Sequence, residues 1–170
     1  MAPYHCEQSR AHWCVPACCC IVLGHLGDPR CQQEAQLAQQ LFVGRNGASL
    51  EEAASHLGWQ YLQIDADDPR SYEWLRARKD PLAILQVFGG PLTRALAARY
   101  PRLTSRFGPL CSDFSGPPLH AVVLRGADPR GVTIQDPYYP AADQPLYLSN
   151  DEFAVAFQGA LVLPNRRRRG

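Results

Sequence analysis

Two segments that lie far apart in the sequence carry the side chains that could do chemistry. Near the N-terminus, Gln8 precedes a Trp-Cys-Val-Pro-Ala-Cys run at 13–18, and much later His120 is followed by Asp136. Together they supply a thiol, an imidazole, a carboxylate and a side-chain amide. A cysteine hydrolase needs a thiol, a base to activate it, a group to orient the base and donors for the oxyanion. The pattern therefore predicts nucleophilic catalysis by a cysteine.

Cys14 is well placed for activation if it begins a helix. Pro16 would then fall in the first turn, where proline is tolerated, and we expect the helix to run from Cys14 to Leu26. The positive end of a helix dipole and a neighbouring protonated histidine both lower the pKa of a thiol. Gln8, six residues before Cys14, is predicted to donate its side-chain N–H to the oxyanion, with the backbone N–H of Cys14 as the second donor.

His120 and Asp136 are predicted to lie on one β-hairpin. The Asp-Pro-Arg-Gly sequence at 128–131 is a turn signal, with expected strands at 119–125 and 132–136. If the strands pair about residue 128, His120 lies directly opposite Asp136, with their Cβ atoms about 5 Å apart. The same register places two apolar pairs on that face, Val122 with Ile134 and Leu124 with Val132. We expect this face to lie toward the start of the first helix, with the carboxylate orienting the imidazole.

The other cysteines are predicted to be structural. Seven cysteines, four of them within 14–20, make a poor disulfide framework and favour a reducing compartment, so we expect the protein in the cytoplasm. We interpret Cys18, Cys19 and Cys20 as small core residues. A zinc-binding structural domain is an alternative because Cys14 and Cys18 would share a helix face. The isolated positions of Cys31 and Cys111 supply no second ligand pair, so we expect no metal and no cofactor.

The bulk composition is that of an ordinary globular protein. The chain has 170 residues, of which 46% are hydrophobic and 19% charged, which suits a single domain over residues 1–165. The net charge of +1 gives no electrostatic reason to expect a nucleic acid partner. No apolar run approaches the ~20 residues of a membrane span, and no secretory signal is visible. The four arginines in 166–170 are interpreted as a solvated basic tail.

Periodicity and turn signals predict helices first and strands later. Helices are expected at 14–26, 31–42, 50–58, 72–78 and 94–100, and another begins at Ser149; Ser49 and Glu52 have the spacing of a capping box. Strands are expected at 59–64, 82–88, 119–125, 132–136, 146–148 and 160–163. This segregation is typical of an α+β fold, in which N-terminal helices carrying the nucleophile pack on an antiparallel sheet carrying His120 and Asp136.

The combined pattern resembles the papain-like, bacteriocin-processing peptidases that cut double-glycine leaders, as a stand-alone member. The resemblance rests on Gln8, the Cys-Val-Pro-Ala-Cys run at 14–18, the His-Ala-Val-Val-Leu run at 120–124 and Asp136-Pro137, and it covers residues 4–164. It implies a papain-like fold in which Cys14 is the nucleophile, His120 the base, Asp136 its orienting acid and Gln8 an oxyanion donor. We expect their sequence neighbours to contact the substrate: Trp13, Val15 and Leu119.

Two departures from the family bear on the substrate. Val15 stands where the family usually has glycine, which puts a preference for glycine before the cut in question. Residues 89–118 form a longer insertion, which we expect to make a wall or lid facing the substrate. The resemblance implies a peptide or protein substrate, for which a neighbouring gene is one source, and association with an exporter is a further option because many relatives are exporter domains.

Two other functions remain open at this stage. The same site could run thiol acyl transfer, in the manner of a transglutaminase, or isopeptide cleavage. The fold could also serve as a non-catalytic module that binds leader peptides, although such a module would be expected to lose the nucleophile, and Cys14 is present.

Overall fold

A six-stranded sheet with helices on both faces forms the centre of the computed structural model, which describes residues 4–42, 47–110 and 119–165. The strand order is β1-β6-β2-β3-β4-β5, and every neighbouring pair is antiparallel. The strands are β1 (Gln60–Gln63), β2 (Ala83–Phe88), β3 (Leu119–Asp128), β4 (Gly131–Gln135), β5 (Leu146–Ser149) and β6 (Phe157–Leu163).

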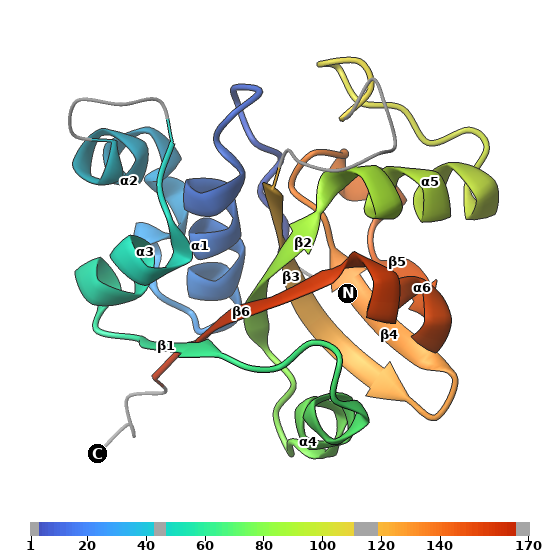
Figure 1. Cartoon of the computed structure of the whole chain (residues 1–170). Helices are drawn as coiled ribbons and strands as arrows, with labels where there is room; N and C mark the ends of the chain where they lie inside the picture. The colour runs from blue at the N-terminus through green and yellow to red at the C-terminus, as the bar shows by residue number, and fades with distance from the viewer. Residues whose placement is uncertain (1–3, 43–46, 111–118, 166–170) are drawn as a thin grey trace.

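The helices divide into two layers (Figure 1). The first layer is α1 (Cys14–His25), α2 (Glu34–Leu41) and α3 (Leu50–Leu57), and the second is α4 (Pro69–Ala77), α5 (Gly89–Arg99) and α6 (Asn150–Ala156). Each layer shares a separate hydrophobic cluster with one face of the sheet. The α+β architecture predicted from the sequence is therefore confirmed. No helix within the described residues is both long enough and apolar enough to span a membrane.

Helix α1 is the central helix of the first layer. Nine of its residues are buried, including Cys18, Cys19 and Cys20, which are fully inaccessible. A helix that is apolar on all sides belongs inside a protein, which confirms the core interpretation of these three cysteines. Its first residue is Cys14, as predicted, and Trp13 precedes it without making a side-chain cap. The first turn of α1 therefore has no side-chain cap from its N-cap residue.

Three expected helices begin elsewhere, for local reasons. The segment 31–42 is interrupted: a short 3₁₀ helix at Pro29–Gln32, capped by Asp28, precedes α2. Helix α4 begins at Pro69 because the Asp68 side chain accepts from the backbone of Arg70. Helix α5 begins at Gly89 rather than at 94, since Pro91 lies in its first turn, where no intrahelical N–H is needed. The predicted capping box of Ser49 and Glu52 is present.

The hairpin register differs from the predicted one. Leu124 pairs with Ile134 and Val123 with Gln135, so the predicted pairs His120–Asp136, Val122–Ile134 and Leu124–Val132 are wrong by two residues near the site. Because side chains alternate with a period of two, a shift of two leaves every residue on its predicted face. His120 and Asp136 therefore remain on the same face as diagonal neighbours, still within reach of long side chains.

A β-bulge at Arg125 produces this arrangement. Beyond the bulge Gly126 pairs with Thr133, whereas before it Leu124 pairs with Ile134, so Arg125 is the extra residue on β3. If the register set at the turn continued without a bulge, Asp136 would lie opposite Val123 and on the other face from His120. The bulge thus restores the alternation that places the two side chains together.

Candidate active site

The Cys14 thiol lies at the N-terminal end of α1 and is half-buried. Burial alone would raise its pKa, but the hydrogen bond and the positive charge of His120 outweigh burial, so the pKa of Cys14 is lowered. The helix N-terminus acts in the same direction. This is the environment of a reactive thiolate rather than of a packing residue.

His120 lies at the start of β3, where it bridges the thiol and a carboxylate. Its side chain is 3% exposed, and its Nε2 lies 2.7 Å from Oδ1 of Asp136. Burial disfavours the imidazolium, yet the charge and hydrogen bond of Asp136, with a contribution from Cys14, raise the pKa of His120 to about 10. The body of α1 packs on the opposite face of β3, against Ala121 and Val123, while the start of α1 comes beside His120.

Asp136 is fully buried just beyond the end of β4. Its Oδ1 accepts from His120 and from the backbone N–H of Tyr138 at 3.0 Å. The Tyr138 ring stands edge-on to the imidazole at 5.9 Å and covers the pair. The carboxylate of Asp136 therefore holds the imidazole of His120 in one orientation.

Gln8 is also buried, but its amide is occupied. Its Nε2 donates to the carbonyl oxygens of Arg10 and Ala11, each at 2.9 Å. Its backbone N–H donates to the carbonyl of Pro137 at 2.8 Å, which places Gln8 next to the turn that carries Asp136. The predicted proximity to the site is therefore present, while both amide protons already have acceptors.

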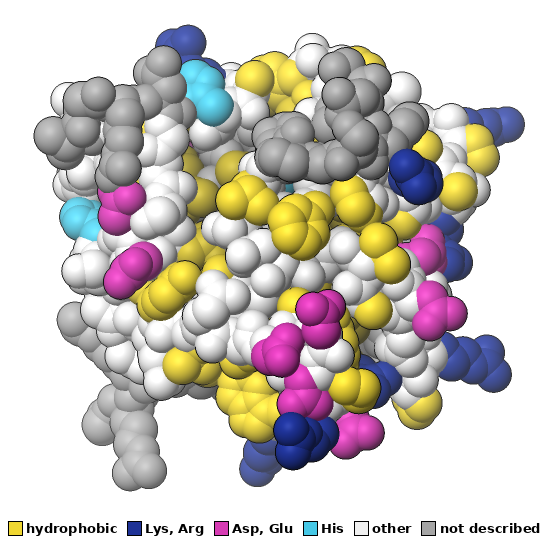
Figure 2. All heavy atoms as spheres, in the orientation of Figure 1, with side chains coloured by type: hydrophobic (Ala, Val, Ile, Leu, Met, Phe, Trp, Pro, Cys, Tyr) yellow, Lys and Arg dark blue, Asp and Glu magenta, His cyan; other side chains and the backbone are white. Residues whose placement is uncertain are grey.

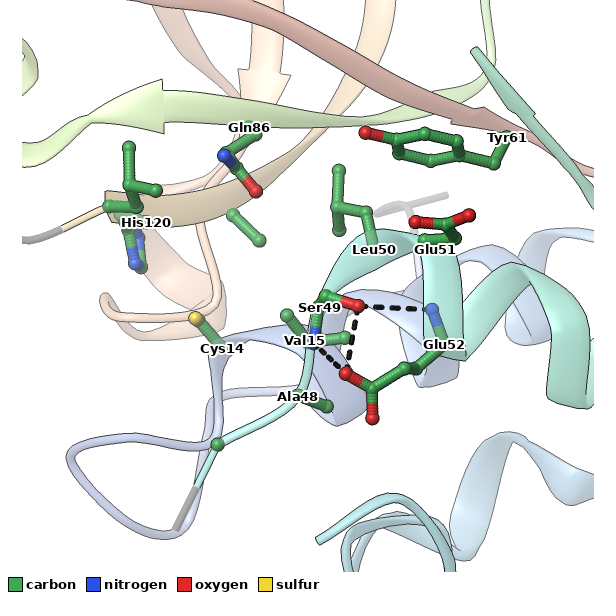
Figure 3. A pocket seen from close by; sticks show the side chains of 13 residues that line it. Cys14, Val15, Ala48, Ser49, Leu50, Glu51, Glu52, Tyr61, Gln86 and His120 are labelled. Atoms are coloured by element: carbon green, nitrogen blue, oxygen red, sulfur yellow. Dashed lines mark hydrogen bonds between the residues drawn. The ribbon is translucent and has the colours of Figure 1, made fainter. Parts of the chain in front are cut away.

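A cleft of about 490 Å³ runs from Cys14 and His120 toward α3 and β1. Figure 3 shows the sulfur and the imidazole at one end, with Tyr61 and Glu51 at the other. Figure 2 shows the same face from outside, with hydrophobic side chains in its middle and most charges around the rim. Its volume lies in the range of pockets that bind small molecules or short segments of chain.

The predicted substrate contacts are only partly brought together. Val15 and Leu119 line the cleft, and Leu119 is 49% exposed. Trp13 lines a separate depression instead, where it lies against Phe42 and beneath the guanidinium of Arg10. Several lining residues were not predicted as substrate contacts, because they lie far in sequence from Cys14 and His120: Ser49, Leu50, Glu51, Glu52, Tyr61 and Gln86.

The described part of the insertion after β2 does not form the expected wall of the cleft. None of its residues, 89–110, lines the cleft. Arg106 instead donates to the carbonyl of Gln8 and lies 3.5 Å from Glu7, and the carbonyl of Gly108 accepts from the Tyr138 hydroxyl at 3.1 Å. This part therefore contacts the N-terminal segment around Gln8 and the turn that follows Asp136. Residues 111–118, including Cys111, and the tail 166–170 lie outside the described residues.

Comparison with known proteins shows which solved structures share this fold. The sequence matches no protein-family model and no curated protein. It is similar in structure to the peptidase domain of Streptococcus ComA, a bifunctional ABC transporter of a quorum-sensing pathway, at 19% identity and a TM-score of 0.58 over 93% of this chain and 94% of that chain. It is also similar to a double-glycine motif protease from an AMS/PCAT transporter in complex with the leader peptide, at 17% identity and a TM-score of 0.54 over 96% and 90%.

The chain has the fold of double-glycine peptidases. A C39-like peptidase from Bacillus anthracis shares it as well, at 15% identity and a TM-score of 0.59 over 98% of this chain and 96% of that chain. The resemblance inferred from the motifs is therefore confirmed for the fold. At such identities the chemistry of this chain rests on its own residues.

A metal centre has no ligand set among the described residues. Within 4–42, 47–110 and 119–165, no three His, Cys, Asp or Glu side chains converge in a way that could hold a metal ion. The six cysteines in these ranges are all free thiols.

Proposed function

We propose that this protein is a cysteine endopeptidase in which Cys14, His120 and Asp136 form the catalytic triad. The observation that carries the proposal is the buried His120–Asp136 pair, 2.7 Å apart, with the imidazole beside the Cys14 thiol at the start of a helix, where it lowers the pKa of that thiol. Because Nε2 faces Asp136, Nδ1 is the ring nitrogen left to exchange a proton with Cys14.

The reaction follows from these contacts. The Cys14 thiolate adds to the carbonyl carbon of the scissile peptide, and the carbonyl electrons move to oxygen. His120 then gives its Nδ1 proton to the leaving nitrogen as the C–N bond breaks, which releases an amine and leaves a thioester on Cys14. Water adds to the thioester while His120 accepts its proton, and cleavage of the C–S bond restores the thiolate and the imidazolium.

The oxyanion donors in this proposal are the backbone N–H of Cys14 and the side chain of Gln8. Gln8 can serve only if it exchanges one of its two carbonyl acceptors for the oxyanion. The exchange keeps the number of hydrogen bonds constant and replaces a neutral acceptor by a charged one, which makes the stronger bond. Gln8 would thus bind the transition state better than the ground state.

We propose a peptide leader or a partner protein as the substrate. One structural neighbour is a double-glycine protease in complex with its leader peptide, which supports an extended peptide in the same cleft. The side chain of Val15 forms part of the cleft next to Cys14, so residues with small side chains are expected before the cut. We further propose a cytoplasmic location beside an exporter, in keeping with the transporter origin of the neighbours.

The intact triad favours catalysis over a binding-only role. Hydrolysis and acyl transfer share the thioester, and they differ only in whether water or an amine attacks it.

Capture of the thioester-forming thiol tests the proposal. A double-glycine peptide chloromethyl ketone should alkylate Cys14 of the wild type, forming a stable thioether with loss of chloride that intact-mass spectrometry detects, and should form none on Cys14→Ala. The Cys14→Ala variant should keep the fold, with a stability change of about 1 kcal/mol or less. An adduct on another residue, or cleavage of a leader peptide by Cys14→Ala, would refute the assignment.

A further inference from the structure

Asp136 lies where the backbone ladder stops. Strand β4 ends at Gln135 and β5 begins at Leu146. The pairing of Ile134 with Leu146, continued by two residues, would place Asp136 opposite Gln144. Pro145 intervenes and has no N–H to donate, so backbone pairing cannot continue there.

The side chain of Gln144 supplies the missing pair of hydrogen bonds. Its Oε1 accepts from the backbone N–H of Asp136 at 3.0 Å, and its Nε2 donates to the carbonyl of Asp136 at 3.0 Å. The same Nε2 lies 3.4 Å from the carbonyls of Tyr139 and Pro140. One amide therefore takes the place of a strand for Asp136 and closes the turn at 136–140.

That turn sets the position of the carboxylate. The backbone N–H of Tyr138 holds the oxygen of Asp136 that also bonds His120. Moving the Asp136 backbone would therefore change both contacts of Oδ1 at once, and a displacement of about 1 Å in a catalytic group can cost about 10²-fold in rate.

We propose that Gln144 is a positioning residue of the triad, which fixes the backbone of Asp136 so that its carboxylate stays on Nε2 of His120. This inference rests on the proposed function, because it assigns Gln144 a role only through Asp136. Sequence reasoning had no signal for it, since a glutamine in a loop belongs to no motif.

The test follows the pH dependence of Cys14 alkylation by iodoacetamide, which needs no cognate substrate. In Gln144→Met the amide is replaced by an apolar chain of similar length. A displaced Asp136 stabilises the imidazolium less, and the imidazolium in turn stabilises the thiolate less. We expect the onset of alkylation to move to higher pH than in the wild type, in the direction of Asp136→Asn, with a fall of roughly tenfold in rate at pH 6.

Gln135→Met is the matched control. Gln135 is also buried, and its amide bonds His25, His5 and the carbonyl of Tyr4, so its loss removes a similar number of bonds without touching the backbone of Asp136. We expect its pH profile to match that of the wild type. The other titratable groups that face Asp136 make no bond to Gln144: His5, Cys18, Tyr138 and Tyr139. His5 stays neutral over most of the range, because burial lowers its pKa.

The outcomes distinguish failure of the Gln144 role from failure of the triad itself. A shift in Gln144→Met and none in Gln135→Met supports the positioning role. A wild-type profile in Gln144→Met, or an equal shift in Gln135→Met, overturns it. If Asp136→Asn also leaves the profile unchanged, the triad itself fails. Should Gln144→Met not fold, Gln144→Asn, which keeps a neutral amide but is one methylene too short to make both bonds to the Asp136 backbone, is judged by the same criteria.

Discussion

At the scale of single residues, neighbouring cysteines of one helix have pKa values shifted in opposite directions. Cys14 has a lowered pKa because His120 overcomes the effect of burial, whereas burial raises the pKa of Cys18 well above its usual value and that of Cys19 to about 12. The difference comes from one turn of helix, which moves the side chain from the lip of the cleft into the core. Position relative to His120 therefore decides which of these thiols has a lowered pKa, as the proposed nucleophile needs.

Selective alkylation measures this difference. With limiting iodoacetamide at pH 7, we expect Cys14 to be labelled before Cys18, Cys19 and Cys20, because the thiolate is the reactive form and these three are inaccessible. Peptide mapping by mass spectrometry gives the order of labelling. A denatured sample, in which all cysteines react at similar rates, is the control. Earlier labelling of Cys18 in the native protein would contradict the assignment.

The pH dependence of turnover follows from the pKa shifts of Cys14 and His120. The pKa of Cys14 is lowered and that of His120 is raised to about 10, so the thiolate–imidazolium pair exists between them. Below the acid limit the thiol is protonated, and above the alkaline limit His120 has lost the proton that the leaving nitrogen needs. We expect a bell-shaped kcat/KM for peptide cleavage, with a broad plateau through neutral pH and an alkaline limb near pH 10. An alkaline limb near the ordinary histidine pKa of about 6.5 would contradict the pairing with Asp136.

At the scale of elements, strand faces could be predicted from the sequence but the register could not. Alternation of polar and apolar residues shows which face of the sheet a side chain is on. A register shifted by two residues leaves every side chain on the same face, so the predicted and the observed registers fit the same pattern. The bulge at Arg125 leaves no signal in that pattern. The helix start at Cys14 and the capping box at Ser49 were predictable because both depend on residues within one turn.

A pair of single-residue deletions tests the role of the bulge. Removing Arg125 should close the bulge, leave Leu124 opposite Ile134 and keep the wild-type pH profile of Cys14 alkylation. Removing Ala121 should pull His120 into a position that faces α1 and separate it from Asp136. We expect that variant to alkylate only at the pH of an ordinary thiol. If both deletion variants fold and show the same pH profile of Cys14 alkylation, the bulge does not decide whether His120 and Asp136 share a face of the sheet.

At the scale of the whole molecule, the site forms where two layers meet. Cys14 belongs to helix α1, His120 to β3, and Asp136 follows β4, so neither the helices nor the sheet alone holds the whole proposed triad. The N-terminal segment joins them: the backbone N–H of Gln8 donates to the carbonyl of Pro137 at 2.8 Å, and the ring of His5 lies 2.9 Å from the carbonyl oxygen of Tyr139. No local pattern could reveal these long-range contacts, and the depression around Trp13 was missed for the same reason, because Phe42 comes from a distant part of the sequence. The occupied amide of Gln8 depends instead on the conformation of the loop at 8–11, which no sequence pattern specifies.

Gly24 shows how the segment is seated on α1. A Cβ at this position would overlap the ring of Tyr4, whose hydroxyl donates to the carbonyl of Cys31 at 2.9 Å. The glycine therefore gives up helix propensity so that the ring can lie against the helix, and the ring in turn anchors the chain that leads to Gln8 and Cys14.

Substitution of Gly24 by alanine should have opposite signs in two backgrounds. In the wild type, relief of the glycine penalty contributes about 1 kcal/mol of stability, but displacing the Tyr4 ring costs roughly 1–3 kcal/mol, so we expect net destabilisation. In Tyr4→Ala the space is empty, and the same substitution should stabilise by about 1 kcal/mol. Urea unfolding of the four proteins measures this coupling. Peptide turnover should fall in Gly24→Ala, because the displaced segment also carries Gln8. A stability change of the same sign in both backgrounds would show that the packing of Tyr4 on Gly24 does not hold the segment in place.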